Sequence, residues 1–328
     1  MQKIFEHNIL EIGELKHFHE PRIFNENYSQ IPACIILNGR IHIFYADRLD
    51  TNKSFIKYKI ICLRSFKNIM EPKTFYCPER IGFFDTDGAM PSQIYQTKSE
   101  YFLTYNGWNR LTGTPPYLNS SGRIKINLNK LNEFEFIFAE QNPFLARGPD
   151  NPSSAVTPWI EKSTKNQMVY WIRTEKWTLV SGYYEPLYYI ASGFIDKNGR
   201  CVMRCERIIE PFYSDEVFSR PSIVAIGDKT IMAFCSRSIR DFRDGANSYK
   251  INFAIKNRID RHGWRRIPVK FNANLDWCNL QTSYPCLFSD GEKIYLAFNG
   301  NGFGKTGFGI IDVDKRGLLA LLHSPQLH

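Results

Sequence analysis

The clearest indication of the fold is the segment Pro221-Ser-Ile-Val-Ala-Ile-Gly-Asp-Lys-Thr-Ile-Met-Ala-Phe-Cys235. A proline heads a short apolar strand, a Gly-Asp turn follows, and a second apolar strand ends in Ala-Phe-Cys. Such two-residue turns join antiparallel strands in hairpins. Proline is tolerated at the head of a strand because the hydrogen bond that it cannot donate falls at the end of the ladder. The segment therefore predicts a β-hairpin that begins at Pro221.

The same pattern recurs along the chain. Pro285 heads the copy Pro-Cys-Leu-Phe-Ser-Asp-Gly-Glu-Lys-Ile-Tyr-Leu-Ala-Phe-Asn. Earlier copies begin at Pro32, Pro91 and Pro158, and neighbouring prolines are 59 to 67 residues apart. A further strand follows each hairpin at a distance, and no 3.6-residue apolar period persists along the chain. The chain is therefore built from five similar β units.

Five antiparallel sheets at a constant period are typical of radial repetition. We predict an all-β protein, a five-bladed β-propeller that forms a single domain over residues 1–328. The predicted blades span approximately residues 31–66, 88–136, 152–208, 217–268 and 282–315. The inner strands would converge on a central funnel. The residues directly before and after each proline are expected to line its mouth.

Composition narrows the classes that fit. A chain of 328 residues with 43% hydrophobic and 23% charged residues is too apolar to be disordered. No run reaches the roughly 18 apolar residues that a membrane-spanning helix needs. Residues 1–10 lack the apolar stretch of a secretory signal. We therefore expect no integral membrane segment and a cytoplasmic location.

The net charge of +9 favours anionic partners such as a nucleotide sugar, a phosphate or an acidic glycan. The excess is scattered without a block of like charges, so a generally basic protein is the plain alternative, and no nucleic-acid partner is predicted. The eight cysteines form no Cys-x-x-Cys pair and are interpreted as reduced and structural. His17, His19 and His42 lack the spacing of metal ligands. No cofactor is expected, and an ion in the propeller channel stays open.

Three carboxylates are candidates for catalysis. Asp85 and Asp87 precede Pro91, and Glu216 precedes Pro221. Carboxylates from different blades that meet near an axis can divide the roles of general acid and general base, the arrangement of glycoside chemistry. The structural alternatives are that Asp85 and Asp87 form a loop, and that Glu216 pairs with Arg220, four residues on.

The substrate-binding candidates are arginines that suit bidentate binding of phosphate or carboxylate, aromatic residues that stack on sugar faces, and polar residues near the predicted mouth. They are Arg48, Trp108, Asn109, Arg173, Arg220, Arg237, Tyr284, Asn301 and Lys305. Structural ion pairs and core tryptophans are the alternatives. The stretch 299–309, Asn-Gly-Asn-Gly-Phe-Gly-Lys-Thr-Gly-Phe-Gly, misses the spacing of a Walker phosphate loop by one residue. We interpret it as a glycine-rich hairpin that approaches the funnel.

Four stretches carry a family resemblance: Phe-Asp-Thr-Asp-Gly-Ala-Met-Pro (84–91), Leu-Thr-Tyr-Asn-Gly-Trp-Asn (103–109), Ser-Arg-Pro-Ser-Ile (219–223) and the segment 284–309. They resemble the glycosidase-like five-bladed propellers, relatives of the arabinanase, levansucrase and invertase superfamily that are often encoded among bacterial polysaccharide-assembly genes. The resemblance implies the same fold and a sugar-binding funnel that contains carboxylates.

The chain departs from that family in its first blade. The family typically places an aspartate base there, where this chain offers only Glu26, and Arg48-Leu-Asp50 stands in place of Arg-Asp. The leading hypothesis is a carbohydrate-active enzyme of bacterial surface-polysaccharide metabolism that acts on a glycosidic bond by transfer, phosphorolysis or hydrolysis. Its substrate would be a sugar, a glycan or a nucleotide sugar. The alternatives are a non-catalytic glycan-binding propeller and a scaffold for protein contacts, and the oligomeric state stays open.

Overall fold

The structure is a computed structural model that describes residues 9–10, 16–18, 28–49, 51–79, 81–97, 99–161, 167–196, 199, 201–243, 245, 247–260, 263–267, 270–271 and 275–313. Glu26, Asp50 and His19 lie outside the described residues. The described chain consists of β-strands, loops and one four-residue helical turn, α1 (Asn301–Gly304). The prediction of an all-β protein is confirmed.

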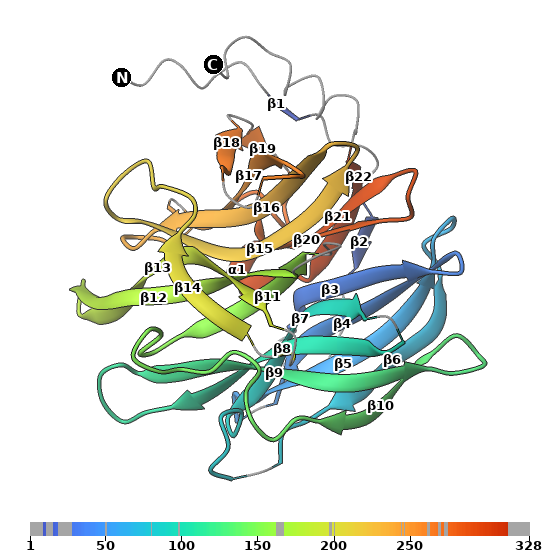
Figure 1. The fold of residues 1–328 in the computed structure, drawn as a ribbon, viewed down its shortest axis with the longest axis horizontal. Helices are drawn as coiled ribbons and strands as arrows, with labels where there is room; N and C mark the ends of the chain where they lie inside the picture. The colour runs from blue at the N-terminus through green and yellow to red at the C-terminus, as the bar shows by residue number, and fades with distance from the viewer. Residues whose placement is uncertain are drawn as a thin grey trace.

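The strands form antiparallel groups of four (Figure 1). The first group is β3 (Gln30–Leu37), β4 (Arg40–Arg48), β5 (Ser54–Cys62) and β6 (Asn68–Tyr76). The second is β7 (Gly88–Gln96), β8 (Tyr101–Arg110), β9 (Tyr117–Leu128) and β10 (Phe134–Ala139). A single parallel bridge between Ser54 and Gly88 joins these two groups into one eight-stranded sheet.

Three further groups follow in chain order. The third is β11 (Ala155–Glu161), β12 (Met168–Val180), β13 (Tyr183–Ile195) and β14 (Cys201–Arg207). The fourth is β15 (Glu216–Ile226), β16 (Lys229–Ser238), β17 (Lys250–Asn257) and β18 (Arg265–Ile267). The fifth is β20 (Ser283–Ser289), β21 (Ile294–Asn299), β22 (Phe308–Val313) and the early strand β2 (Lys16–Phe18). Outside the groups, β1 (Ile9–Leu10) pairs in parallel with β19 (Lys270–Phe271).

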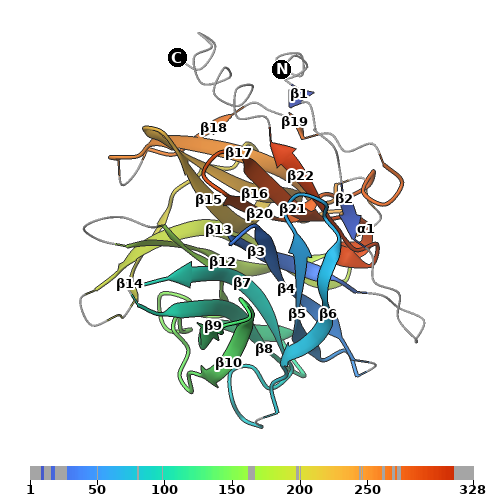
Figure 2. The ribbon, with the colours of Figure 1, turned by 90° about the vertical axis from the view of Figure 1, so that its right-hand side faces the viewer.

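The first strands of the groups contact one another in a circuit. β3 contacts β7, β7 contacts β11, β11 contacts β15, β15 contacts β20, and β20 returns to β3. These strands lie towards the middle of the molecule, whereas β10 and β18 lie at its periphery (Figures 1 and 2). Each first strand carries one of the repeat prolines. The proline repeat therefore marks the strands that surround the centre.

A bulge interrupts each first strand at its proline. The pairing register shifts at these points in β3, β7, β11, β15 and β20. The residue before the proline has a positive φ in four strands: Ile31 (53°), Thr157 (51°), Arg220 (49°) and Tyr284 (54°). Such angles are uncommon for residues other than glycine, and a bulge re-aims the side chain that it carries. The backbone is therefore strained at these residues, and the bulges direct their side chains away from the regular sheet pattern.

Arg220 connects first strands of different groups near the centre. Its side chain is fully buried on β15. One Nη2 group donates to the carbonyl oxygens of Pro32 at 2.6 Å and Ser92 at 3.0 Å. These carbonyls belong to β3 and β7, so one guanidinium connects the first strands of three groups. Burial lowers the pKa of Arg220.

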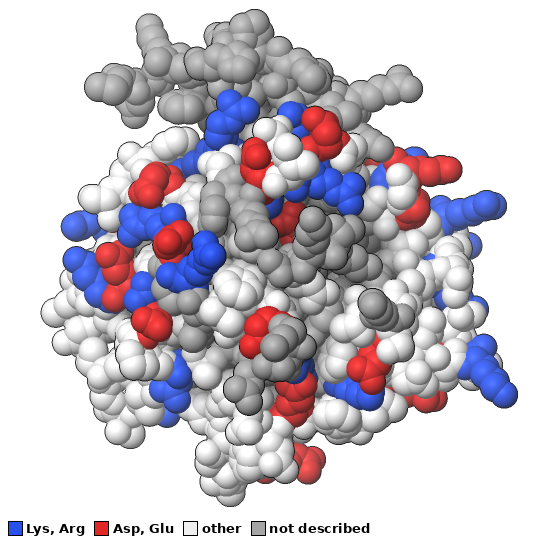
Figure 3. All heavy atoms as spheres, viewed as in Figure 1, with Lys and Arg blue, Asp and Glu red and all other residues white. Residues whose placement is uncertain are grey.

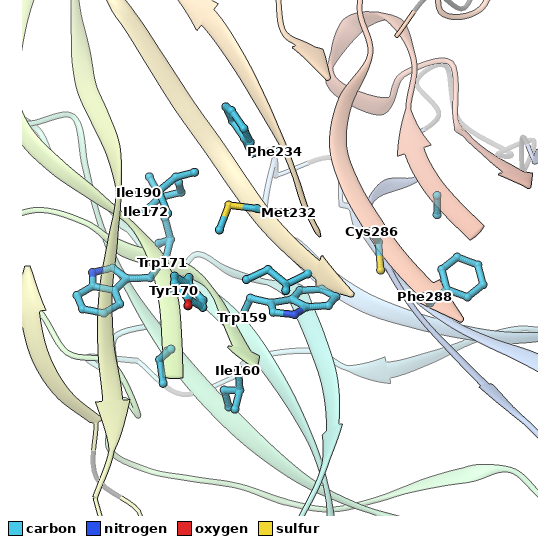
Figure 4. Packing of buried hydrophobic residues seen from close by; sticks show 14 of the residues in the cluster. Trp159, Ile160, Tyr170, Trp171, Ile172, Ile190, Met232, Phe234, Cys286 and Phe288 are labelled. Carbon is cyan, nitrogen blue, oxygen red and sulfur yellow. The ribbon is translucent and has the colours of Figure 1, made fainter. Parts of the chain in front are cut away.

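Apolar packing crosses from group to group. Trp159 of β11, Met232 of β16 and Cys286 of β20 belong to one buried cluster (Figure 4). Trp171 of β12 is fully buried in the same cluster, as expected for a core tryptophan. Seven cysteines of the described chain are free thiols: Cys34, Cys62, Cys77, Cys201, Cys235, Cys278 and Cys286. The core thus lies between neighbouring sheets and leaves the polar ends of the strands around the centre.

Candidate functional site

A cavity of about 360 Å³ opens where the groups meet. This volume lies within the range of small-molecule sites, about 300–1,000 Å³. All five groups contribute side chains or the loops beside them. The lining residues are Ile31, Arg48, Asn52, Met90, Asn106, Trp108, Tyr117, Asn119, Val156, Thr157, Ile172, Tyr188, Ser219, Tyr249 and Tyr284.

The proline repeat locates this cavity. Ile31, Met90, Thr157 and Tyr284 each stand directly before a repeat proline, and all four line the cavity. In the fourth group, Ser219 lines it instead, because Arg220 turns into the interior. The expectation that residues beside the prolines surround a central site agrees with this lining.

Two residues of the cavity lining carry buried polar atoms that lack a protein partner. Among the described residues, the Asn119 Oδ1 and Thr157 Oγ1 atoms are buried without a hydrogen-bond partner. Asn106 is different, because its Oδ1 accepts the Thr157 backbone N–H at 2.6 Å. A buried polar group left unpaired costs about 1–3 kcal/mol.

Aromatic side chains form much of the wall. The Tyr117 and Tyr188 hydroxyls lie 2.8 Å apart, and Trp108 Nε1 donates to Ser54 Oγ at 2.7 Å. Burial raises the pKa of Tyr117 to about 12 and also raises the pKa of Tyr249. These phenols are therefore neutral near pH 7 and can both donate and accept hydrogen bonds. The wall combines flat apolar faces with polar tips, which suits a ligand that is itself amphipathic.

The described lining of the cavity carries positive charge. Among the described residues of its lining, Arg48 is the only charged one, and none is an aspartate or a glutamate. Arg48 Nε donates to Gln30 Oε1 at 3.0 Å, and Nη1 donates to Asn52 Oδ1 at 2.7 Å. Lys305 lies close by, since both cations face the ring of Tyr28. The site is therefore neutral to positive.

The predicted catalytic carboxylates lie outside this lining. Asp85 is fully buried and accepts hydrogen bonds from Tyr76 Oη at 2.7 Å and Tyr105 Oη at 2.9 Å. Its other oxygen, Oδ1, has no described partner. Asp87 accepts the backbone N–H of Arg110 at 2.7 Å. Asp85 and Asp87 are thus both engaged by protein groups.

Glu216 is held in a salt bridge. Arg266 donates to its carboxylate through Nη1 at 2.8 Å and through Nη2 at 3.0 Å. The Phe212 backbone N–H donates to the same carboxylate at 2.7 Å. Its cation is therefore Arg266, whereas the sequence suggested Arg220. The catalytic assignment of Asp85, Asp87 and Glu216 stays a prediction.

The predicted binding residues divide into two sets. Arg48, Trp108 and Tyr284 line the cavity, and Lys305 is connected to its edge through Tyr28. Asn109 instead donates to the Phe83 carbonyl at 2.8 Å.

The remaining predicted binding residues make structural contacts. Arg173 bonds to the Tyr189 hydroxyl, and Arg220 occupies the interior described above. Asn301 accepts the Leu280 and Gln281 backbone N–H groups at 3.0 and 2.9 Å.

Arg237 lies behind the cavity wall. It is 4% exposed, lies over the rings of Phe242 and Tyr249, and forms an ion pair with Glu185 at 3.7 Å. Glu185 also pairs with Arg243. Because Tyr249 lines the cavity, Arg237 supports the wall and Glu185 is a buried carboxylate behind it. No sequence pattern singled out Glu185.

The sequence analysis did not predict several lining residues, including Tyr117, Asn119, Tyr188 and Tyr249. The pairing of strands within a hairpin could have identified one of them. Alternation places Tyr117 and Asn119 on one face of β9, and Asn119 is the cross-strand partner of Trp108 on β8. A prediction that paired each candidate with its opposite residue in the hairpin would have found Asn119.

No cluster of three His, Cys, Asp or Glu side chains suited to a metal ion occurs among the described residues. Within the same part of the chain, no helix is long and apolar enough to cross a bilayer.

Comparison with known proteins places the fold. No family model matches the chain. Two uncharacterized proteins of Mycobacterium tuberculosis are each 22% identical to it over 295 residues, which is 88% of this chain and 93% of each relative.

The solved structures with a similar fold include glycoside hydrolases. One described as a glycoside hydrolase has a TM-score of 0.66 at 11% identity, covering 95% of this chain and 93% of that one. An α-L-arabinofuranosidase from Lactobacillus brevis has a TM-score of 0.63 at 10% identity, covering 87% and 90%. A β-fructofuranosidase of Bombyx mori has a TM-score of 0.61 at 16% identity, covering 90% and 61%. The resemblance to glycosidase-like propellers is thus confirmed at the level of the fold.

Proposed function

We propose that the protein binds a carbohydrate in the central cavity, and that the five groups of strands are the five blades of a single-domain propeller around it. The circuit of contacts among β3, β7, β11, β15 and β20 supports the blade count. The glycoside hydrolases of similar fold support carbohydrate as the ligand class.

The observation that carries the proposal is the combination of groups on the cavity wall. Trp108 and several tyrosines offer flat faces, and the Asn119 and Thr157 oxygens are buried without partners. Aromatic faces and unpaired hydrogen-bonding atoms together match a sugar, which has apolar C–H faces and a rim of hydroxyls. The described carboxylates Asp85, Asp87 and Glu216 are engaged by protein groups outside the lining, which favours binding as the first candidate.

Substitution of Asn119 tests the site. Calorimetric titration of the full-length protein with monosaccharides and their methyl glycosides should give binding to at least one of them. Asn119→Ala should weaken that binding by roughly tenfold, because it removes a buried acceptor. Asn68→Ala is the matched control, since Asn68 is exposed on β6, lies outside the lining, and its side chain donates to Glu71 of the same strand. Equal affinity in both variants and the wild type would contradict the cavity as the site.

The second candidate is an enzyme that acts on a glycosidic bond by transfer, phosphorolysis or hydrolysis. The fold shared with glycoside hydrolases favours it. In this form the protein would act in the cytoplasm on a glycan or nucleotide sugar of surface-polysaccharide metabolism. It requires that Asp85→Asn and Glu216→Gln abolish turnover while the variants stay folded by circular dichroism. Turnover at the wild-type rate in either variant would remove that residue from the mechanism.

A further inference from the structure

The Arg48 guanidinium has no carboxylate partner among the described residues. Both of its hydrogen bonds go to neutral amides, Gln30 and Asn52. A guanidinium carries five N–H donors in a rigid fork. Part of the fork is thus left unengaged at a residue that lines the cavity.

The acidic side chains around the site already have cations of their own. Asp87 faces Arg110 at 4.0 Å, and Asp47 faces Lys57 at 3.8 Å. The buried Glu185 has two arginines, as described above. None of these described carboxylates is left to neutralise Arg48.

A second cation adds to the local charge. The Arg48 guanidinium lies 5.0 Å from the centroid of the Tyr28 ring, and the Lys305 ammonium lies 5.7 Å from the same centroid. Arg48 and Tyr284 both line the cavity. One side of the cavity is thus positive.

This charge is local. On the face seen in Figure 3, lysines and arginines are interspersed with aspartates and glutamates. The net charge of +9 is therefore not gathered into one broad patch on that face. Selection of an anion by the cavity would then depend on the few cations at its edge.

We infer, building on the proposed function, that the bound carbohydrate carries an anionic group, a carboxylate or a phosphate, and that Arg48 binds this group. Guanidinium pairs with carboxylate or phosphate through parallel charge-assisted hydrogen bonds. The sugar ring would then extend from Arg48 towards Trp108 and the unpaired Asn119 and Thr157 oxygens.

The test compares acidic sugars with their neutral parents. Isothermal titration of the full-length protein would use glucose, glucuronate and glucose 1-phosphate, then galactose and galacturonate, then UDP-glucose and UDP. Inorganic phosphate alone serves as the control for an anion without a sugar. At least one acidic sugar should bind roughly tenfold tighter than its neutral parent. That preference should narrow between about 0.05 M and about 0.5 M salt, because added ions screen charge. The uronate, sugar-phosphate and nucleotide-sugar arms identify which source supplies the anion.

Two variants complete the test. Arg48→Gln should bring the ratio of acidic to neutral affinity close to one and leave the neutral sugar within about twofold of wild type. Arg40→Gln is the matched control, because Arg40 is on the same strand but donates to the Leu131 carbonyl at 2.9 Å and is outside the lining.

The outcomes separate the two proposals. Equal binding of acidic and neutral sugars, or an acid preference that survives Arg48→Gln, overturns the anion inference and leaves sugar binding intact. Binding of phosphate and UDP with no gain from the sugar, or no binding of any probe, overturns sugar recognition itself.

Discussion

At the scale of single residues, the buried His42 of β4 makes the stability of the fold depend on pH. Its ring is fully buried, Nδ1 lies 2.8 Å from Tyr58 Oη, and Nε2 has no described partner. Burial, with a smaller effect from Arg40, lowers its pKa from 6.5 to about 4. The folded state therefore keeps His42 neutral at pH values where the unfolded state protonates it.

We predict that this histidine weakens the fold in mild acid. The unfolded chain binds the extra proton below pH 6.5, so the free energy of unfolding should fall as the pH drops from 6.5 to about 4. The full loss is about 3 kcal/mol, at 1.36 kcal/mol per pKa unit. Urea unfolding at several pH values should show a shallower dependence for His42→Leu than for wild type. Identical slopes would show that His42 does not control this pH dependence.

At the scale of strands, the Glu216–Arg266 pair joins the first strand of the fourth group to its last. Both side chains are largely buried, at 2% and 9% exposure. Removing one partner of a buried pair leaves an unpaired charge or donor set, which costs about 3–5 kcal/mol. We predict a loss of this size for Glu216→Gln, measured by urea unfolding, and a smaller loss for Glu216→Gln combined with Arg266→Met.

That prediction bears on the interpretation of activity. A Glu216→Gln protein that loses turnover because it unfolds says nothing about catalysis. The double variant, with much of the stability restored, is the appropriate protein for the assay. If the single and double variants were equally unstable, the pair would not be the reason for the loss.

The strands also show how far sequence reasoning reached. Apolar patterns after Pro221 and Pro285 located the hairpins, yet β15 begins at Glu216, well before its proline. The apolar run was recognised only from Pro221, because Ser219, Arg220 and the bulge before the proline interrupt the alternation, while pairing with β16 continues back to Glu216. Trp108 was predicted as a binding residue, but Tyr117, Asn119 and Tyr188 were not. Polar residues that line a cavity resemble loop residues in a linear sequence. Arg220 was predicted as a binding residue beside Arg48, and its full burial at the bulge of β15 could not be read from the linear sequence.

At the scale of the whole molecule, β2 and β22 connect distant parts of the chain. β2 (Lys16–Phe18) pairs antiparallel with Phe308–Ile310 in the fifth group, as Figures 1 and 2 show. Without β2, the backbone edge of β22 would be open to other chains. A sheet that includes both an early and a late segment resists opening at that point.

We predict that deletion of residues 1–27 lowers the melting temperature and promotes aggregation, because it exposes the edge of β22. Deletion of residues 1–13 is the control, since it removes β1 and retains β2. Differential scanning calorimetry and size-exclusion chromatography would compare the two proteins. A 1–27 deletion that melts at the wild-type temperature and stays monodisperse would show that β2 is dispensable.

The residues with positive φ before the prolines have a further consequence. At Ile31, Thr157 and Tyr284 the backbone, rather than the side chain, determines where the chain points. Glycine and asparagine accept this geometry readily. Either residue at one of these positions would therefore relieve backbone strain, while it removes a side chain that lines the cavity.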